Sequence, residues 1–238
     1  MVDIAVVDYG MGNLRSVHQA VRKVAPNASV SVTDDAKVIA SAGRVIFPGQ
    51  GAMPDCMREL DSRGLRQAVL EAAHSKPFLG ICIGLQMLFE HSAEGNVPGL
   101  GVLPGEVVRF AHDLKDAQGS KLKVPHMGWN QVRRGVNPQL PQGVETVALP
   151  PSGGKLEGGN TSEHPLWTGI EPDARFYFVH SFYVQPRDAG VVQATSDYPQ
   201  PFVCAAARDN LFAVQFHPEK SAAAGLKLLQ NFVNWNPV

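Results

Sequence analysis

A cysteine between two glycines is the first feature of this sequence that could do chemistry. Cys82 lies between Gly80 and Gly84 in "PFLGICIGLQMLFE" (77–90), where an apolar strand is expected to turn into a helix. Glycines flank the nucleophile of Gly-x-Ser-x-Gly hydrolases in the same way, because the strained turn has no room for side chains. A thiol at a helix start is also favoured as the thiolate. Free cysteines are commonly buried, so this stretch alone leaves a nucleophile and a core residue both open.

A nucleophilic thiol needs a base, and the base needs a group that orients it. The segment "AVQFHPEKS" offers His217 at the end of a strand-like run, followed by Pro218 and Glu219. If the chain stays extended through the proline, side chains two residues apart point the same way, and Glu219 reaches the imidazole. A charged surface turn is the alternative interpretation of this segment. Cys56 and Cys204 lack such a setting, and we expect both in the core.

Two glycine-containing turns are candidate binding loops. "FPGQGAMP" (47–54) ends a strand in Pro-Gly-x-Gly, whose backbone N–H groups can point at a developing oxyanion, although Pro-Gly turns are common. "DYGMGN" (8–13) lacks the third glycine of a dinucleotide fingerprint, because Arg15 stands there. No histidine has a cysteine or histidine at zinc-site spacing, so we expect no metal and no cofactor.

In the first half of the chain, the strands and helices that would position these groups are expected to alternate. Apolar runs at 4–10, 44–49 and 77–81 predict strands, and amphipathic or glycine-led segments at 12–25, 64–75 and 84–90 predict helices. Leu65, Val69 and Ala72 share one face of the second helix. Short apolar strands separated by helices predict an α/β fold with a mostly parallel sheet flanked by helices.

The second half is rich in strand-like runs separated by turn residues. Six such runs lie at 106–110, 130–134, 175–184, 191–196, 202–209 and 211–216. They predict an antiparallel extension, so that the whole sheet is mixed. A closing helix is expected over 221–234, with Leu226, Leu229, Phe232 and Val233 facing inward.

The composition argues against several other classes of protein, namely nucleic-acid-binding, membrane and secreted proteins. The chain has 238 residues, 44% of them hydrophobic, and a net charge of −1, which gives no footprint for nucleic acid. No apolar run approaches the roughly 20 residues of a membrane span, and the N-terminus does not resemble a signal peptide. Three scattered cysteines favour reduced thiols and a cytoplasmic protein. We expect one domain over 1–238, with a surface insertion at 135–165, where eleven residues are Gly or Pro and only 144–149 could form a strand.

Taken together, the motifs resemble a known family. "GICIGLQMLFE" with "QFHPEKS" is similar to the class I, or triad, glutamine amidotransferases. "VVDYGMGNLRSV", "FPGQGAMPDC", "VPHMGWN" and "FYFVHSFYV" narrow the resemblance to the glutaminase subunits of imidazole glycerol phosphate synthases. It covers nearly the whole chain. The resemblance implies the class I amidotransferase fold, with a flavodoxin-like core, and a role in histidine biosynthesis.

The resemblance also implies a reaction. Cys82 would attack the side-chain amide of L-glutamine, His217 would act as base and then acid, and Glu219 would orient His217. A glutamyl thioester would then be hydrolysed to glutamate. The ammonia would pass to a (β/α)8-barrel cyclase subunit, the partner in a heterodimer, which makes imidazole glycerol phosphate and the aminoimidazole carboxamide ribonucleotide. Bulk water would protonate ammonia, which explains why it would be channelled.

Further positions follow from the resemblance alone. The oxyanion turn would be formed by Gly49, Gln50 and Gly51, and Gln86 would contact the substrate. Backbone groups at the substrate carboxylate would come from His180, Ser181 and Phe182. Positions near the partner would be Asn13, Trp129 and Lys220, unless Trp129 is a core residue and Lys220 a solvated one. Gln50 departs from the valine often found there, so the resting geometry of the turn is left open.

Three rival functions compete with this interpretation. One is the glutaminase subunit of another triad amidotransferase, serving anthranilate or pyridoxal phosphate synthesis, which Lys220 and "PHMGWN" disfavour. The second is a non-catalytic binding subunit, which the intact Cys82, His217 and Glu219 disfavour. The third is a cysteine hydrolase or peptidase, against which Gln86 and "HSF" (180–182) argue.

Overall fold

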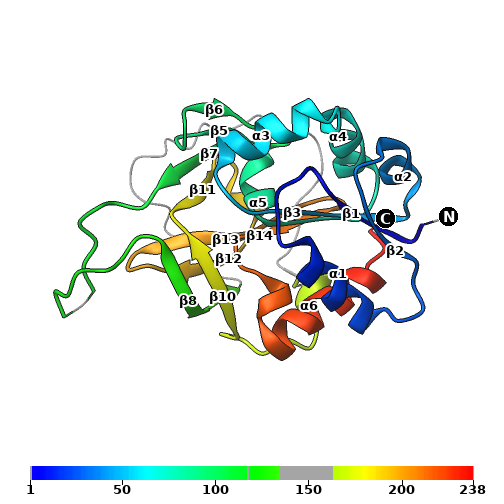
Figure 1. The fold of residues 1–238 in the computed structure, drawn as a ribbon. Coiled ribbons are helices and arrows are strands. Elements are labelled where there is room, and N and C mark those ends of the chain that lie inside the picture. The colour runs from blue at the N-terminus through cyan, green and yellow to red at the C-terminus, as the bar shows by residue number, and fades with distance from the viewer. Residues whose placement is uncertain (1, 117, 135–162, 238) are drawn as a thin grey trace, which may run out of the picture.

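Five short strands form the parallel part of the central sheet, in the order β2-β1-β3-β4-β14 (Figure 1). They are β1 (Ile4–Val7), β2 (Val30–Thr33), β3 (Arg44–Gly49), β4 (Phe78–Cys82) and β14 (Leu211–Val214). Every residue of β1, β4 and β14 is buried, because helices cover both faces. The order 2-1-3-4 followed by a fifth strand is that of doubly wound, flavodoxin-like sheets, in which ligands bind at the carboxyl ends of the strands. The computed structural model describes residues 2–116, 118–134 and 163–237.

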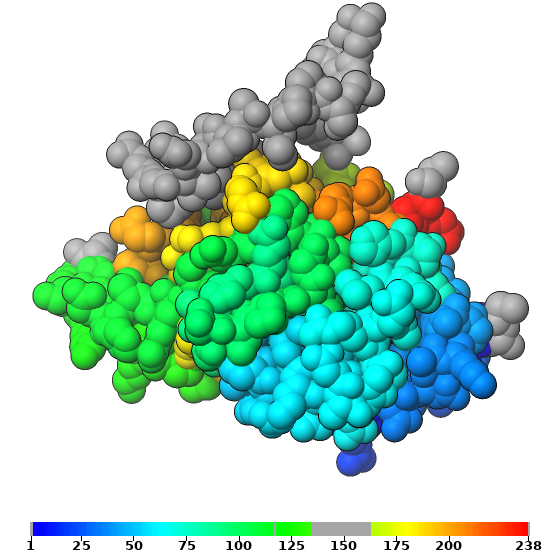
Figure 2. Space-filling model, turned by 90° about the horizontal axis from the view of Figure 1, so that it is seen from above, coloured from blue at the N-terminus to red at the C-terminus, as the bar shows by residue number. Residues whose placement is uncertain are grey.

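Helices cover the two faces of this parallel part. α1 (Leu14–Val24) and α6 (Ala222–Asn234) lie together on one face in Figure 1, and α2 (Ala36–Ser41), α3 (Met53–Ser62) and α4 (Arg66–Ser75) lie on the other. Figure 2 views the molecule from above and shows α3 and α4 in cyan at the surface, beside the green segment that follows them. The predicted stripe of Leu65, Val69 and Ala72 is buried. None of the described helices is long and apolar enough to cross a membrane.

The remaining strands extend the sheet and form a second, smaller one. From β14 outward the order is β13 (Pro201–Arg208), β11 (Phe182–Pro186), β7 (Leu103–Arg109), β5 (Phe89–Ser92) and β6 (Val97–Pro98). β12 (Val192–Asp197) pairs with β13 and with β9 (Arg133–Arg134). β8 (His126–Gln131) and β10 (Arg175–His180) pair antiparallel as a separate two-stranded sheet. The predicted α/β fold, a mixed, mostly parallel sheet flanked by helices with an antiparallel extension, is therefore confirmed.

Three details of the predicted extension were wrong. β14 runs antiparallel to β13 but parallel to β4, so it closes the parallel part and brings the chain that follows it to the carboxyl end of β4. β5 and β7 also pair parallel. The run 175–184 is not one strand: it breaks at Ser181, and its halves β10 and β11 belong to different sheets.

The expected helix over 84–90 was also wrong in its length. α5 spans only Ile83–Met87, and the chain then enters β5. Leu88 and Phe89 accept backbone hydrogen bonds from Leu103 and Gly101, at 2.9 and 3.1 Å. The preference of this apolar stretch for helix is therefore overridden by pairing with a distant segment, which no local pattern encodes.

The inward face of α6 was predicted only in part. Gly225, Leu228, Leu229 and Phe232 are buried, whereas Leu226 and Val233 are only partly so. Gly225 fixes this rotation, because a Cβ there would lie 1.9 Å from the carbonyl oxygen of Pro218. The helix thus touches the preceding turn at its glycine. Of the expected insertion at 135–165, residues 135–162 lie outside the described residues, as does the possible strand at 144–149.

Candidate active site

Cys82 is the last residue of β4 and immediately precedes α5. Its backbone has φ 57° and ψ −110°, a strained conformation for a residue with a side chain. The residue is 3% exposed and lines a pocket. Glycine is required beside it, because a Cβ at Gly84 would lie 2.0 Å from the carbonyl oxygen of Phe47, and one at Gly80 would lie 2.9 Å from Cβ of Ala213. The glycine-flanked elbow predicted from sequence is the observed local structure.

His217 lies three residues beyond the end of β14, and β14 is the parallel neighbour of β4. Its backbone N–H donates to the carbonyl of Tyr177 (2.9 Å), and its carbonyl accepts from the Ser221 hydroxyl (2.6 Å). Nδ1 lies 2.9 Å from Oε1 of Glu219. The sequence analysis expected an extended chain here, but Pro218–Lys220 forms a single 3-10 turn. That turn still brings Glu219 back onto the imidazole.

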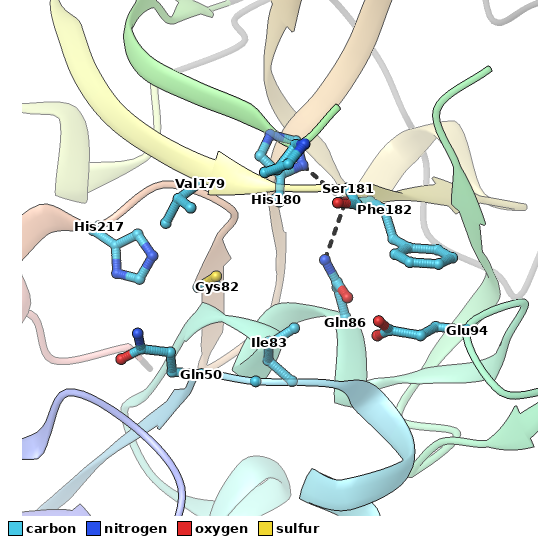
Figure 3. Close-up of a pocket in the computed structure, with 12 residues that line it drawn as sticks. Gln50, Cys82, Ile83, Gln86, Glu94, Val179, His180, Ser181, Phe182 and His217 are labelled. Atoms are coloured by element: carbon cyan, nitrogen blue, oxygen red, sulfur yellow. Dashed lines mark hydrogen bonds between the residues drawn. The ribbon is translucent and has the colours of Figure 1, made fainter. Parts of the chain in front are cut away.

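The electrostatics of His217 favour its charged form. Burial alone would lower the pKa of the imidazole, but the nearby Cys82 sulfur and the Glu219 carboxylate outweigh it and raise the pKa to about 10. Nε2 of His217 is buried and makes no hydrogen bond among the described residues. In Figure 3 the ring and the Cys82 sulfur border the same space. A thiolate paired with an imidazolium is the arrangement that activates a cysteine nucleophile.

The pocket has a volume of about 230 Å³, the scale of a small metabolite rather than a polymer. Its walls come from the ends of β3, β4 and β10 and from the chain after β14 (Figure 3). The lining residues are Gln50, Gly51, Cys82, Ile83, Gln86, Glu94, Pro125, Val179, His180, Ser181, Phe182 and His217. Most of the residues predicted for catalysis and substrate binding therefore surround one cavity.

The predicted oxyanion turn reaches this cavity from β3. Gly49 pairs with Cys82 across the two parallel strands, and Gln50 and Gly51 line the pocket beside it. Gly51 has φ 116°, which a residue with a side chain rarely adopts. The structure thus brings the turn to the nucleophile, and donation of its N–H groups to an oxyanion stays a prediction.

Gln86 is buried one helical turn after Cys82. Its side-chain Nε2 donates to the carbonyl of Phe182 (3.1 Å) and to Oε1 of Gln215 (3.0 Å), while its Oε1 makes no hydrogen bond among the described residues. His180, Ser181 and Phe182 form the opposite wall. A buried acceptor without a partner, on a residue that lines a pocket, is suited to a ligand N–H group.

Gln215 was missed by the sequence analysis. It is fully buried, and its Nε2 donates to Sγ of Cys82 at 3.7 Å while its Oε1 accepts from Gln86. It therefore connects the thiol with the side chain expected to meet the substrate. Its position two residues before His217, on the same strand-like run, was the available signal.

The predicted partner positions lie outside the pocket lining. Trp129, on β8, is 46% exposed and packs edge-on against Tyr177, with the ring centres 6.2 Å apart. Lys220 holds its ammonium 6.0 Å from the same ring. Asn13 is partly buried at the start of α1. Trp129 is therefore not a core residue, and Cys56 and Cys204, as expected, are.

A glycine-flanked cysteine elbow, joined by histidine and glutamate at the carboxyl ends of a doubly wound sheet, defines the triad class of amidotransferases. The family model "Glutamine amidotransferase class-I" matches residues 5–235, and the chain belongs to that family. Its relatives include imidazole glycerol phosphate synthase subunit HisH of Aromatoleum aromaticum, 58% identical over the full length of both chains. HisH of Thiobacillus denitrificans is also 58% identical, over 99% of this chain and 92% of that one.

Solved structures share the fold at low sequence identity. A crystal structure of a glutamine amidotransferase superposes with a TM-score of 0.64 at 16% identity, covering 97% of both chains. The structure of PurLQS from Thermotoga maritima gives a TM-score of 0.62 at 18% identity, over 98% of this chain and 99% of that one. These likenesses concern the fold alone.

Proposed function

We propose that this chain is the glutaminase subunit of an imidazole glycerol phosphate synthase, releasing ammonia from L-glutamine for histidine biosynthesis. The observation that carries the proposal is the pocket in which Cys82, the His217–Glu219 pair and Gln86 meet. Identity of 58% over the full length to HisH subunits supports the choice of synthase. Other triad amidotransferases, serving anthranilate or pyridoxal phosphate synthesis, remain the second candidate, and nothing in the pocket favours them.

In the proposed mechanism the Cys82 thiolate attacks the side-chain carbonyl carbon of glutamine, forming a C–S bond. The carbonyl oxygen becomes an oxyanion beside the turn of Gly49, Gln50 and Gly51, whose backbone N–H groups would stabilise it. His217 then gives its proton to the departing nitrogen, the C–N bond breaks, and ammonia leaves. A glutamyl thioester remains on Cys82.

Hydrolysis reverses these roles. Neutral His217 takes a proton from water as the hydroxide attacks the thioester carbonyl, and the C–S bond breaks to release glutamate and restore the thiolate–imidazolium pair. Glu219 keeps Nδ1 of His217 protonated throughout, so that Nε2 is the nitrogen that exchanges protons. The chain needs no cofactor for these steps.

The released ammonia would pass to a (β/α)8-barrel cyclase subunit. Two exposed apolar side chains on β8, Met127 (66% exposed) and Trp129, together with Lys220, form a surface suited to that partner. Exposed aromatic residues are enriched at protein interfaces. The three free cysteines are consistent with a reducing, cytoplasmic setting.

A glutaminase assay of the full chain, with and without the cyclase and its nucleotide substrate, tests this proposal. We expect feeble hydrolysis by the chain alone and strong acceleration by the complete mixture. Full activity of the chain alone, unchanged by partner or nucleotide, would contradict its assignment to a coupled synthase.

A further inference from the structure

Two buried histidines outside the triad lie in direct contact, and one of them, His180, lines the pocket. His126 begins β8 and His180 ends β10, and the two are register partners in the small sheet. Nδ1 of His126 lies 3.0 Å from Nε2 of His180. Both side chains are buried, and rings of Phe110, Phe178 and Phe202 pack around them. Such a contact requires one nitrogen to donate and the other to accept.

Asn130 determines which nitrogen carries the proton. Its Oδ1 must accept, because it lies 2.8 Å from the backbone N–H of Gln131, and its Nδ2 must donate, because it lies 2.8 Å from the carbonyl of Asp197. The amide orientation is thus fixed by two backbone groups. The same Nδ2 lies 3.2 Å from Nε2 of His126, so that ring nitrogen accepts. The proton of neutral His126 must then be on Nδ1.

The position of the proton on His180 follows from that on His126. Because Nδ1–H of His126 donates, Nε2 of His180 accepts, and the proton of His180 is on Nδ1. That atom lies 2.8 Å from the carbonyl oxygen of Phe182, which can only accept. Every hydrogen bond from Asn130 to Phe182 therefore runs in one direction. A second proton on either ring would place two N–H groups face to face.

The lowered pKa values of His126 and His180 agree with two neutral rings. Burial lowers the pKa of His126 to about 4. Burial also lowers the pKa of His180 to about 3, with smaller contributions from His126 and His217, although its bond to Phe182 opposes the change. At neutral pH both imidazoles are therefore uncharged, as the hydrogen-bond directions require.

This hydrogen-bond chain ends at an atom that also holds Gln86. The Phe182 carbonyl accepts from both His180 Nδ1 and Gln86 Nε2. Nε2 of Gln86 uses its second hydrogen on Gln215, so its buried Oε1 is the amide atom left without a hydrogen-bond partner among the described residues. The placement of the Phe182 carbonyl thus determines both the position and the orientation of the Gln86 amide (Figure 3).

We propose that His126 and His180 are positioning residues for glutamine binding, held as Nδ1–H tautomers that tie β8 to the Phe182 carbonyl and so fix the acceptor of Gln86. This inference rests on the proposed glutaminase function. Neither histidine touches the reacting atoms, so their loss acts on substrate binding rather than on the chemical step. β8 is also the strand that exposes Met127 and Trp129.

The first test needs no activity. Two-bond ¹⁵N–¹H correlation spectra of the full chain with ¹⁵N-labelled histidine distinguish the two neutral tautomers and the cation at pH 7. We expect both residues as neutral Nδ1–H tautomers, assigned by comparison with His126→Phe and His180→Phe. An Nε2–H tautomer or a cation at either position would overturn the proposal.

The second test measures glutamine hydrolysis with the cyclase subunit present. His180→Phe keeps an aromatic ring but loses the donor to Phe182, so KM should rise roughly tenfold, with kcat changed far less. His180→Asn places an amide N–H near the former Nδ1 and should recover much of that loss. Phe110→Leu removes packing against both rings but no hydrogen bond, and serves as the matched control.

The outcomes separate the two proposals. An effect of His180→Phe no larger than that of Phe110→Leu, or a loss in kcat alone, would overturn the positioning role. If His180→Phe does not fold, His126→Phe and His126→Asn make the same comparison one bond further away. Absence of glutaminase activity in the wild-type complex would instead contradict the proposed function, and the tautomer measurement would still decide the state of the pair.

Discussion

Oε1 of Glu219 lies 2.9 Å from Nδ1 of His217, and the two side chains are only 1% and 3% exposed. A carboxylate buried this deeply is stable only if it is paired, and Oε1 makes this pairing, since Oε2 of Glu219 has no hydrogen bond among the described residues. The pair therefore fixes the ring orientation and favours the imidazolium. It leaves Nε2 of His217, which makes no hydrogen bond among the described residues, for the proton transfers proposed with Cys82.

Replacement of Glu219 by Gln tests the electrostatic part of this pair. The variant keeps a hydrogen-bonding side chain of the same size but loses the charge that, together with the Cys82 sulfur, raises the pKa of His217. We expect kcat for glutamine hydrolysis to fall about a hundredfold or more. The alkaline limb of the pH–rate profile should move to lower pH, because His217 deprotonates more readily. An unchanged profile with full kcat would contradict the role assigned to Glu219.

The elbow makes a stability prediction at Gly84. A Cβ there would lie 2.0 Å from a backbone oxygen, which cannot move aside cheaply, so Gly84→Ala should lower the free energy of unfolding by about 3 kcal/mol. Gly101→Ala is the control for crowding, because no atom lies within 4 Å of the added carbon and the only cost is the strain of its positive φ. That variant should lose about 1–2 kcal/mol. Denaturant melts compare the two, and equal losses would contradict the crowding argument.

The exposed surface of β8 makes a prediction about binding. Trp129→Ala should weaken the complex with the cyclase by roughly tenfold or more, because aromatic side chains commonly dominate interface energies. Its exposure of 46% means that folding of the free chain should be little affected. Val32→Ala, at an exposed apolar site on β2, is the control. Titration calorimetry measures both affinities, and equal values would place the partner elsewhere.

Two buried histidines, His126 and His180, and the half-buried His164 predict how stability depends on pH. Burial lowers the pKa of His126 and His164 to about 4 and that of His180 to about 3, from about 6.5 when unfolded. Between those values the unfolded chain binds more protons. Their contribution is therefore complete above pH 6.5 and is lost as the pH falls toward 4 and 3.

Each of these histidines adds a slope of up to about 1.4 kcal/mol per pH unit to the free energy of unfolding within that window. Urea melts from pH 7 to pH 4 measure the slope for the wild type and for His126→Phe. The variant should show a shallower loss of stability on acidification. Identical slopes would mean that His126 is not held neutral by burial.

Sequence patterns predicted the elements whose signals are local. β1, β3 and β4 are apolar runs that end in turns, and the elbow at Cys82 is marked by two glycines within four residues. The pairing of Glu219 with His217 was found although the chain turns instead of staying extended, because residues two apart meet in either geometry.

The features that were missed depend on distant partners. Phe89 was expected in a helix but lies in β5, which pairs with β7, and β14 pairs parallel with β4. Both pairings are determined only in the assembled sheet. Gln215 and the His126–His180 pair were not identified because their roles arise from contacts across about 50 to 130 residues of sequence. The residue types alone were compatible with ordinary core or surface positions.

The most direct test of the central claim is glutamine-dependent turnover by the complex of the chain with its cyclase subunit, compared between wild type and Cys82→Ala. Cys204→Ala, at another buried thiol, is the matched control and should remain active. We predict that Cys82→Ala produces no glutamate, while ammonium salts still support formation of imidazole glycerol phosphate. Glutamate production by Cys82→Ala at the wild-type rate would contradict the account.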